Sequence, residues 1–171
     1  MSMEFLPNPK TLNKYEVVEH EFAMAFARYV NLFNMLERNI GLCIRYKQVQ
    51  PEFRATAKQL DNLSFNGKLE RLTTIVDQNG FDISKKGLKK DYARWLQLMD
   101  KSREARNLYV HGDWYVCVEA KQPIQFTPLR WVERENEDRT ERMTMDEFLA
   151  RMKELDHVSE QFHLLRQKYG I

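Results

Sequence analysis

Lys101-Ser-Arg-Glu-Ala-Arg-Asn-Leu-Tyr-Val-His-Gly112 is the stretch on which the predicted fold depends. We expect a helix that begins near Leu88 and stops at Gly112, because glycine just past a helical pattern is the usual left-handed stop residue. The apolar face of this helix carries Leu88, Tyr92, Trp95, Leu96 and Met99 at helical spacing. Followed onward, that face meets Arg103, Arg106, Asn107 and Val110, so the stripe is expected to turn from apolar to polar within one helix.

The polar end of this helix combines residue types that suit phosphate chemistry. A buried guanidinium without partners is costly, so Arg103 and Arg106 either pair internally or line a cleft. Asn107 and His111 are one helical turn apart on one face, and the long side chain of Arg106 can reach the same point. Histidine can act as acid or base near neutral pH, and arginine with asparagine can hold a phosphate. These residues therefore predict cleavage of a phosphodiester without a metal ion.

The segment Arg106-Asn107-Leu-Tyr-Val-His111, with Gly112-Asp113-Trp114 after it, resembles the signature of the HEPN superfamily (higher eukaryotes and prokaryotes nucleotide-binding domains). That signature is an arginine, a polar residue and a histidine about one turn later at the end of a late helix. The stretch Leu63-Ser-Phe-Asn-Gly-Lys-Leu69 is similar to the segment that opens the second helix in many members. The resemblance implies a small helical bundle, often a metal-independent endoribonuclease of toxin or phage-defence systems, which dimerises so that two motifs form one site.

Three functions remain open at this level. In the first, an endoribonuclease leaves 2′,3′-cyclic phosphate ends. His111 is its general acid/base, Arg106 stabilises the phosphorane charge and Asn107 orients His111 or a phosphate oxygen. In the second, the chain is a non-catalytic module that binds RNA, a nucleotide or a partner, and relatives of this kind imply an antitoxin as that partner. In the third, Arg106 pairs internally and His111 only ends its helix.

Length and composition favour one domain over residues 1–171, helical in 11–112, with a β insert in 113–143 and a last helix in 144–169. Hydrophobic residues make up 43% and charged residues 30%, and the net charge is only +2, so any RNA contact must come from a local patch. Cys43 and Cys117 are expected to be small buried thiols or a single disulfide. We expect no metal, no cofactor and no membrane span, and we place the chain in the cytoplasm.

The predicted class is mainly α: a HEPN-like bundle of four to five helices with a small antiparallel β insert before the last helix. The first helix covers Tyr15–Ile44, a short one Pro51–Leu60, and the next runs from about Lys68 to Gln78 with Ser64 or Asn66 as its cap. Glu37 on the first helix either pairs with Arg106 or lies on a solvated flank. The stripe of the first helix consists of Tyr15, Val18, Phe22, Phe26, Tyr29, Phe33, Leu36, Ile40 and Cys43.

The β insert is predicted from aromatic and β-branched runs at Trp114–Ala120 and Leu129–Arg134, with a third short strand near Arg139–Met143. Pro123 and Pro128 favour edge positions or an irregular hairpin. Trp114 is expected in the core rather than as a base-stacking platform. Thr144-Met-Asp-Glu147 is a capping box that begins the last helix. The stripe of that helix is Phe148, Met152, Leu155, Val158, Phe162, Leu165 and Tyr169.

A basic strip follows the outer face of the helix that carries Arg106. Lys90, Arg94, Lys101 and Arg103 are the candidates for contacting an RNA backbone. Each cation is also compatible with a merely solvated face. Lys90 lies ~30 Å from His111 by the helical rise, so such residues guide RNA rather than cleave it within their own chain.

Overall fold

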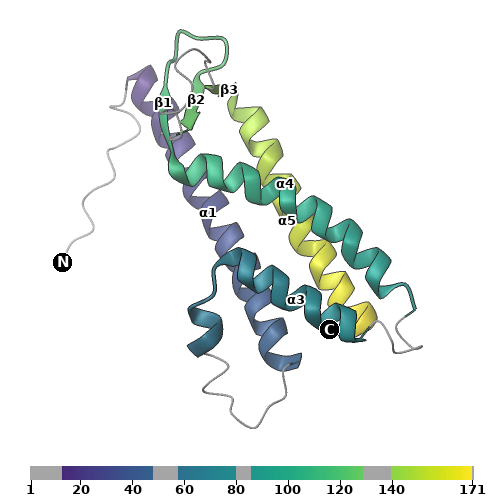
Figure 1. Ribbon diagram of the computed structural model, residues 1–171. Helices are drawn as coiled ribbons and strands as arrows, with labels where there is room; N and C mark the ends of the chain where they lie inside the picture. Colours follow the sequence, from purple (N-terminus) through teal and green to yellow (C-terminus); the bar gives the residue numbers. More distant parts are fainter. Residues whose placement is uncertain (1–12, 48–57, 80–85, 129–139, 171) are drawn as a thin grey trace, which may run out of the picture. The chain divides into compact units, whose positions relative to one another are not determined.

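The structure is a computed structural model of the chain, and it describes residues 13–47, 58–79, 86–128 and 140–170. The predicted class, mainly α with a small antiparallel sheet before the last helix, is confirmed (Figure 1). None of the described helices has the length and hydropathy that crossing a membrane requires. The elements are, in order, α1 (Lys14–Lys47), α3 (Phe65–Asn79), α4 (Leu88–His111), β1 (Gly112–Val116), β2 (Ile124–Pro128), β3 (Glu141–Met143) and α5 (Met145–Tyr169).

The chain divides into two compact units. The first unit consists of residues 1–30 and 103–154, and the second unit of residues 31–102 and 155–171. Helices α1, α4 and α5 each contribute residues to both units. That the chain is a single domain therefore stays a prediction.

The second unit is held together by aromatic contacts and by hydrogen bonds between residues far apart in sequence. The Trp95 ring stacks on Phe162 of α5 at 4.9 Å between centroids, and its Nε1 donates to the Val158 carbonyl at 3.0 Å. The Tyr92 hydroxyl of α4 lies 2.9 Å from the Thr73 hydroxyl of α3. These contacts bury the apolar face of α4 that the sequence predicted, because each ring fills core space while its polar atom still finds a partner.

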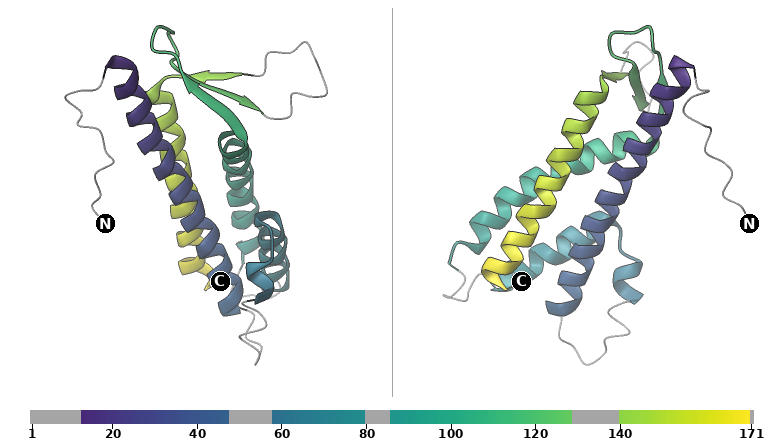
Figure 2. Two further views of the ribbon diagram at one scale, coloured as in Figure 1. Left: turned by 90° about the vertical axis from the view of Figure 1, so that its left-hand side faces the viewer. Right: turned by 180° about the vertical axis from the view of Figure 1, so that it is seen from behind.

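The first unit is built on a three-stranded antiparallel sheet in the order β1-β2-β3. Trp114 of β1 lies directly opposite Phe126 of β2, and both face Phe22 of α1, with ring centroids 4.9 and 5.6 Å away. Phe148 of α5 closes the cluster at 5.1 Å from Phe22. Figure 2 shows the sheet beside the first turns of α1 and α5. Trp114 thus packs against the aromatic core, as predicted, but it stays half-buried at the margin of that core.

The helix ends follow local sequence signals. The Thr144 hydroxyl accepts from the Glu147 amide at 3.2 Å and the Glu147 carboxylate accepts from the Thr144 amide at 2.6 Å, which confirms the capping box. Gly170 ends α5 with φ of +61°, a left-handed conformation that favours glycine. Ser64, rather than Asn66, caps α3, since its hydroxyl accepts from the Gly67 amide at 3.2 Å.

Two strand predictions need correction. The segment after Pro123 is a strand, β2, and it is the central strand of the sheet rather than an edge. The prolines are tolerated because they lie at the two ends of the strand: Pro123 precedes β2 and its carbonyl accepts from the Cys117 amide at 2.8 Å, and Pro128 is the last residue of β2, opposite Gly112. The first strand ends at Val116 and not at Ala120. The predicted strand at Leu129–Arg134 lies outside the described residues, as does most of the predicted helix Pro51–Leu60, of which 58–60 are helical.

Candidate functional site

Arg106, Asn107 and His111 come together at the C-terminal end of α4, within the first unit. The Arg106 Nη1 atom donates to Asn107 Oδ1 at 3.3 Å and lies 3.4 Å from His111 Nε2. Asn107 and His111 are exposed and Arg106 is half-buried. The contact with Arg106 requires a His111 tautomer in which Nε2 carries no proton, because a guanidinium can only donate. The three residues thus present a cation, an amide and an imidazole to solvent at one point.

The residues buried along the second half of α4 differ from those predicted. The buried residues that continue it past Met99 are Ser102 and Tyr109. Asn107 is exposed, and Arg103 lies half-buried beside the stripe. Arg106 follows Tyr92 and Met99 at intervals of seven residues, but it is only half-buried, as Arg103 is. The expected turn of the stripe to polar residues is therefore wrong for Asn107, which is exposed, and both arginines lie at the margin of the buried face.

Two buried tyrosines lie beneath the motif in the first unit. Tyr109 is 1% exposed, and its ring centroid is 5.4 Å from that of Tyr29 on α1. Burial raises the pKa of Tyr109 to about 12. Burial also raises the pKa of Tyr29, which the nearby Arg151 and Arg106 guanidiniums oppose. Both phenols are neutral near pH 7, so neither serves as a general base there.

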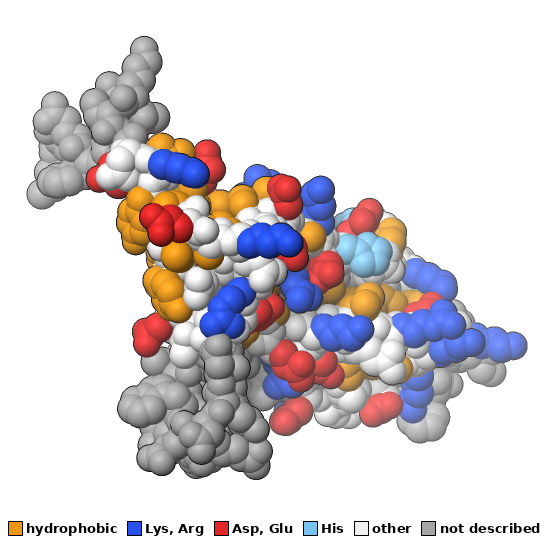
Figure 3. Space-filling view, turned by 90° about the horizontal axis from the view of Figure 1, so that it is seen from above, with side chains coloured by type: hydrophobic (Ala, Val, Ile, Leu, Met, Phe, Trp, Pro, Cys, Tyr) orange, Lys and Arg blue, Asp and Glu red, His pale blue; other side chains and the backbone are white. Residues whose placement is uncertain are grey.

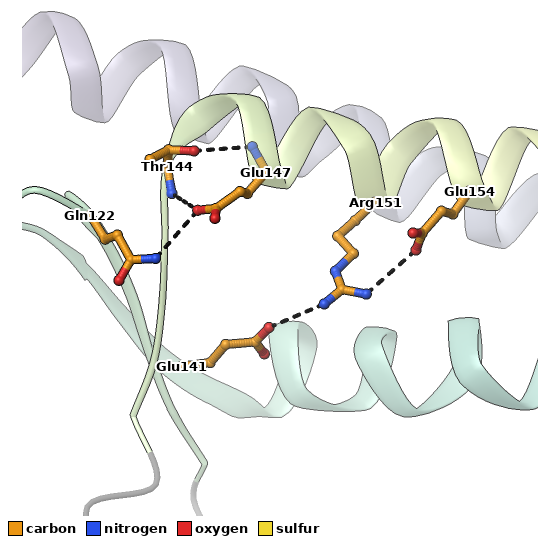
Figure 4. Close-up of polar contacts among 6 residues, drawn as sticks. All are labelled: Gln122, Glu141, Thr144, Glu147, Arg151 and Glu154. Atoms are coloured by element: carbon orange, nitrogen blue, oxygen red, sulfur yellow. Dashed lines mark hydrogen bonds and ion pairs between the residues drawn. The ribbon is translucent and has the colours of Figure 1, made fainter.

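Arg151 of α5 is a residue of this region that the sequence did not single out. Its Nη1 lies 3.5 Å from Glu154 Oε2 and its Nη2 lies 3.7 Å from Glu141 Oε1 of β3 (Figure 4). The same guanidinium faces the Tyr109 phenol and lowers its pKa against the larger effect of burial, although the buried Tyr109 hydroxyl makes no hydrogen bond of ordinary geometry within the described residues. No local pattern on α5 could have identified Arg151, because its partners come from α4, β3 and its own helix.

Gly112 joins the motif to the sheet, and the predicted reason for this glycine was wrong. Within the described residues, only Gly87 and Gly170 have positive φ, so Gly112 is not a left-handed stop. It is the first residue of β1 and pairs with Pro128. A Cβ on Gly112 would lie 2.7 Å from the Leu108 carbonyl oxygen and 2.8 Å from that of Thr127. Glycine is required by the close approach of two backbones, and it links His111 to β1 without an intervening loop.

The predicted RNA-binding residues are divided between the two units. Lys90, Arg94 and Lys101 are exposed and belong to the second unit, whereas Arg103 belongs to the first. Figure 3 shows Lys and Arg side chains interspersed with Asp and Glu on the face seen from above. The continuous basic strip thus stays a prediction, and Arg103 is its one member in the unit that holds His111.

Glu37 forms an ion pair with Lys68, which the sequence did not predict. Its carboxylate lies 2.6 Å from Lys68 Nζ of α3, in the second unit, and the two side chains retain 24% and 16% exposure. Glu37 is therefore half-buried in an ion pair with Lys68 rather than paired with Arg106, while Asn34 and Arg38 beside it on α1 are exposed. A lysine on α3 supplies the opposite charge, and the helix contact that brings it close has no signature in the sequence.

In the described part of the chain, no three His, Cys, Asp or Glu side chains come close enough together to hold a metal ion. Neither Cys43 nor Cys117 forms a disulfide in the structure. Comparison with family models, with curated proteins and with solved structures gave no match to this chain.

Proposed function

We propose that the chain is a metal-independent endoribonuclease of the HEPN type, acting at Arg106, Asn107 and His111. The observation that carries the proposal is the convergence of the Arg106 guanidinium and the Asn107 amide on the imidazole of His111. A guanidinium stabilises the charge that develops on a phosphorane, and an imidazole transfers protons near neutral pH. No other described cluster combines these groups at an exposed helix end.

The proposed reaction is an intramolecular transesterification. A base removes the ribose 2′-hydroxyl proton, the 2′-oxygen attacks the adjacent phosphorus, and the bond to the 5′-oxygen breaks. That oxygen takes a proton from an acid, which leaves a 2′,3′-cyclic phosphate and a 5′-hydroxyl. One His111 supplies one of these proton transfers, so we further propose a homodimer in which His111 of a second copy supplies the other.

The contact between Arg106 and His111 must break before His111 can act as the base. Arg106 donates toward His111 Nε2, the nitrogen whose lone pair a base would use. Entry of an RNA phosphate, which attracts Arg106 more strongly than a neutral imidazole does, would draw the guanidinium away and release Nε2. The same contact also fits a non-catalytic binding module, in which Arg106 and Asn107 hold a phosphate and His111 only orients them.

The test is cleavage of single-stranded RNA by purified protein with EDTA present, followed by analysis of the product ends. We expect cyclic phosphate ends from the parent, a loss of about 10²–10⁴-fold for His111→Ala and of about 10²–10³-fold for Arg106→Ala. His163→Ala is the matched control, because His163 is an exposed histidine of α5. Full activity of His111→Ala would refute the site. RNA binding without cleavage by any variant would favour the binding module.

A further inference from the structure

The sheet of the first unit has an outer face that carries an aromatic side chain. Val116, Ile124 and Phe126 are buried on its inner face. Side chains alternate along strands, so the neighbours of these residues point outward. Tyr115 of β1 keeps 48% of its surface exposed, although its neighbour Trp114 packs on Phe22. An exposed aromatic ring beside a complete aromatic core is not needed for folding.

The Tyr115 ring is held in place across the sheet. Tyr115 lies directly opposite Gln125, and Gln125 lies directly opposite Arg142 on β3. The Tyr115 hydroxyl donates to Gln125 Oε1 at 2.7 Å, and Gln125 is itself only 8% exposed. Two strand spacings separate Tyr115 from Arg142, which is roughly 10 Å. One row of the outer face therefore offers a fixed aromatic surface at one end and an exposed guanidinium at the other.

This row is continuous with the proposed catalytic site. His111 ends α4, Gly112 begins β1 and Tyr115 lies on the same strand, ~13 Å from His111 by the strand rise. The Gly112 backbone is confined between Leu108 and Thr127. The distance between the imidazole and the aromatic ring is therefore fixed by backbone packing rather than by a loop.

We propose that Tyr115, Gln125 and Arg142 form a subsite for single-stranded RNA, in which a base stacks on the Tyr115 ring and Arg142 holds a neighbouring phosphate. The inference rests on the proposed ribonuclease function and names how its substrate is held. Aromatic side chains accept any unstacked base, and arginine neutralises the backbone. Gln125 contributes by fixing the ring. Asp113, the carboxylate in the next row of the same face, repels phosphate and so directs the strand toward Arg142.

The subsite is tested by binding, independently of cleavage. The probe is a short single-stranded RNA with a 2′-O-methyl group on every ribose, which removes the nucleophile and cannot be cleaved by transesterification. Its affinity is measured by fluorescence anisotropy over a range of salt concentrations. A second probe of the same length carries abasic riboses, so it retains the phosphates and lacks the bases.

We expect Tyr115→Ala to weaken binding of the first probe by roughly 5- to 150-fold, the range for one base–aromatic stack. It should not change binding of the abasic probe. Tyr115→Phe, which keeps the ring, should bind as the parent does. Arg142→Gln should weaken binding of both probes and lower the slope of log affinity against log salt by about 0.7, the value for one phosphate contact to a single strand. Tyr46→Ala is the control, because Tyr46 is an exposed tyrosine of the second unit.

The possible results separate this inference from the proposed function. Equal binding by the parent and Tyr115→Ala, or no binding by the parent, overturns the subsite even if His111-dependent cleavage is found. Binding that depends on Tyr115, without cleavage that depends on His111, supports the subsite and overturns the nuclease.

Discussion

Replacing Gly112 with alanine tests whether the end of α4 and the start of β1 are as closely packed as described. The added Cβ would lie 2.7 Å from the Leu108 carbonyl oxygen and 2.8 Å from the Thr127 carbonyl oxygen. Neither atom can move away as a flexible side chain would, because both belong to the backbone. Overpacking of this kind costs about 1–3 kcal/mol, and alanine recovers about 0.5–1 kcal/mol by restricting the unfolded chain.

We therefore expect Gly112→Ala to lower the free energy of unfolding by about 1–2 kcal/mol, equivalent to about 2–8 °C in Tm for a chain of this size. The matched control is Gly41→Ala in α1, where the added Cβ would meet no described atom within 4 Å apart from the adjacent backbone of its own helix. That variant should gain up to about 1 kcal/mol, since alanine is the better helix former. Both values come from urea unfolding followed by circular dichroism.

The comparison has a clear refuting result. If Gly112→Ala is as stable as the parent, with the same dependence on urea, the backbone approach at Leu108 and Thr127 is wrong. The fixed distance from His111 to Tyr115 would then lose its basis. A loss of stability in Gly41→Ala as large as that in Gly112→Ala would show instead that both glycines matter for a reason other than the clash.

Three other substitutions give independent checks. Tyr109→Phe removes a buried hydroxyl that interacts with Arg151 without a hydrogen bond of ordinary geometry in the described residues, so stability should stay within about 0.5 kcal/mol of the parent. Tyr92→Phe, which loses the bond to Thr73, should cost about 1 kcal/mol in the same thermal assay. Thr144→Ala should cost about 1 kcal/mol through loss of the α5 cap, and a Thr144→Ser variant that fails to restore stability would contradict the capping role. The hydrogen bond from Lys168, with a second one from Tyr169, lowers the pKa of Asp91 below 3.8, so Asp91 stabilises the fold above that pH. The stability advantage of the parent over Asp91→Asn should accordingly shrink as the pH falls below about 4, and an advantage independent of pH would refute the ion pair.

The sequence predicts those features that depend on residues close together in the chain. The stripe of α5 and the box at Thr144 and Glu147 follow from helical spacing and from a single turn of backbone. The interactions of Glu37 with Lys68 and of Asp91 with Lys168 could not be predicted, because they join helices separated by long stretches of sequence. Gly112 is an intermediate case: its position after the helix is evident, but the strand that confines it becomes apparent only when Thr127 is placed beside it.

The candidate site was predicted in part for the same reason. Asn107 and His111 lie one turn apart, so their common face follows from helical geometry alone. Tyr29 and Arg151 are supplied by α1 and α5, and the sequence of α4 holds no trace of them. The position of Tyr115 also follows from the sequence pattern, because strict alternation from the buried Val116 places it on the outer face of the strand.

Arg106 is the residue at which structural and chemical explanations of the motif can be separated. It is half-buried and follows the buried Tyr92 and Met99 at a spacing of seven residues on α4. Methionine fills a similar volume without charge, and replacing a partly buried ion by such a residue is often neutral or stabilising. If Arg106 serves phosphate chemistry, Arg106→Met should unfold at the same urea concentration as the parent, or a higher one, while losing cleavage and phosphate binding together. If Arg106 instead holds the helix end together through Asn107 and His111, the variant should unfold at a lower urea concentration, and His111→Ala should lower it no further because the two substitutions remove one interaction.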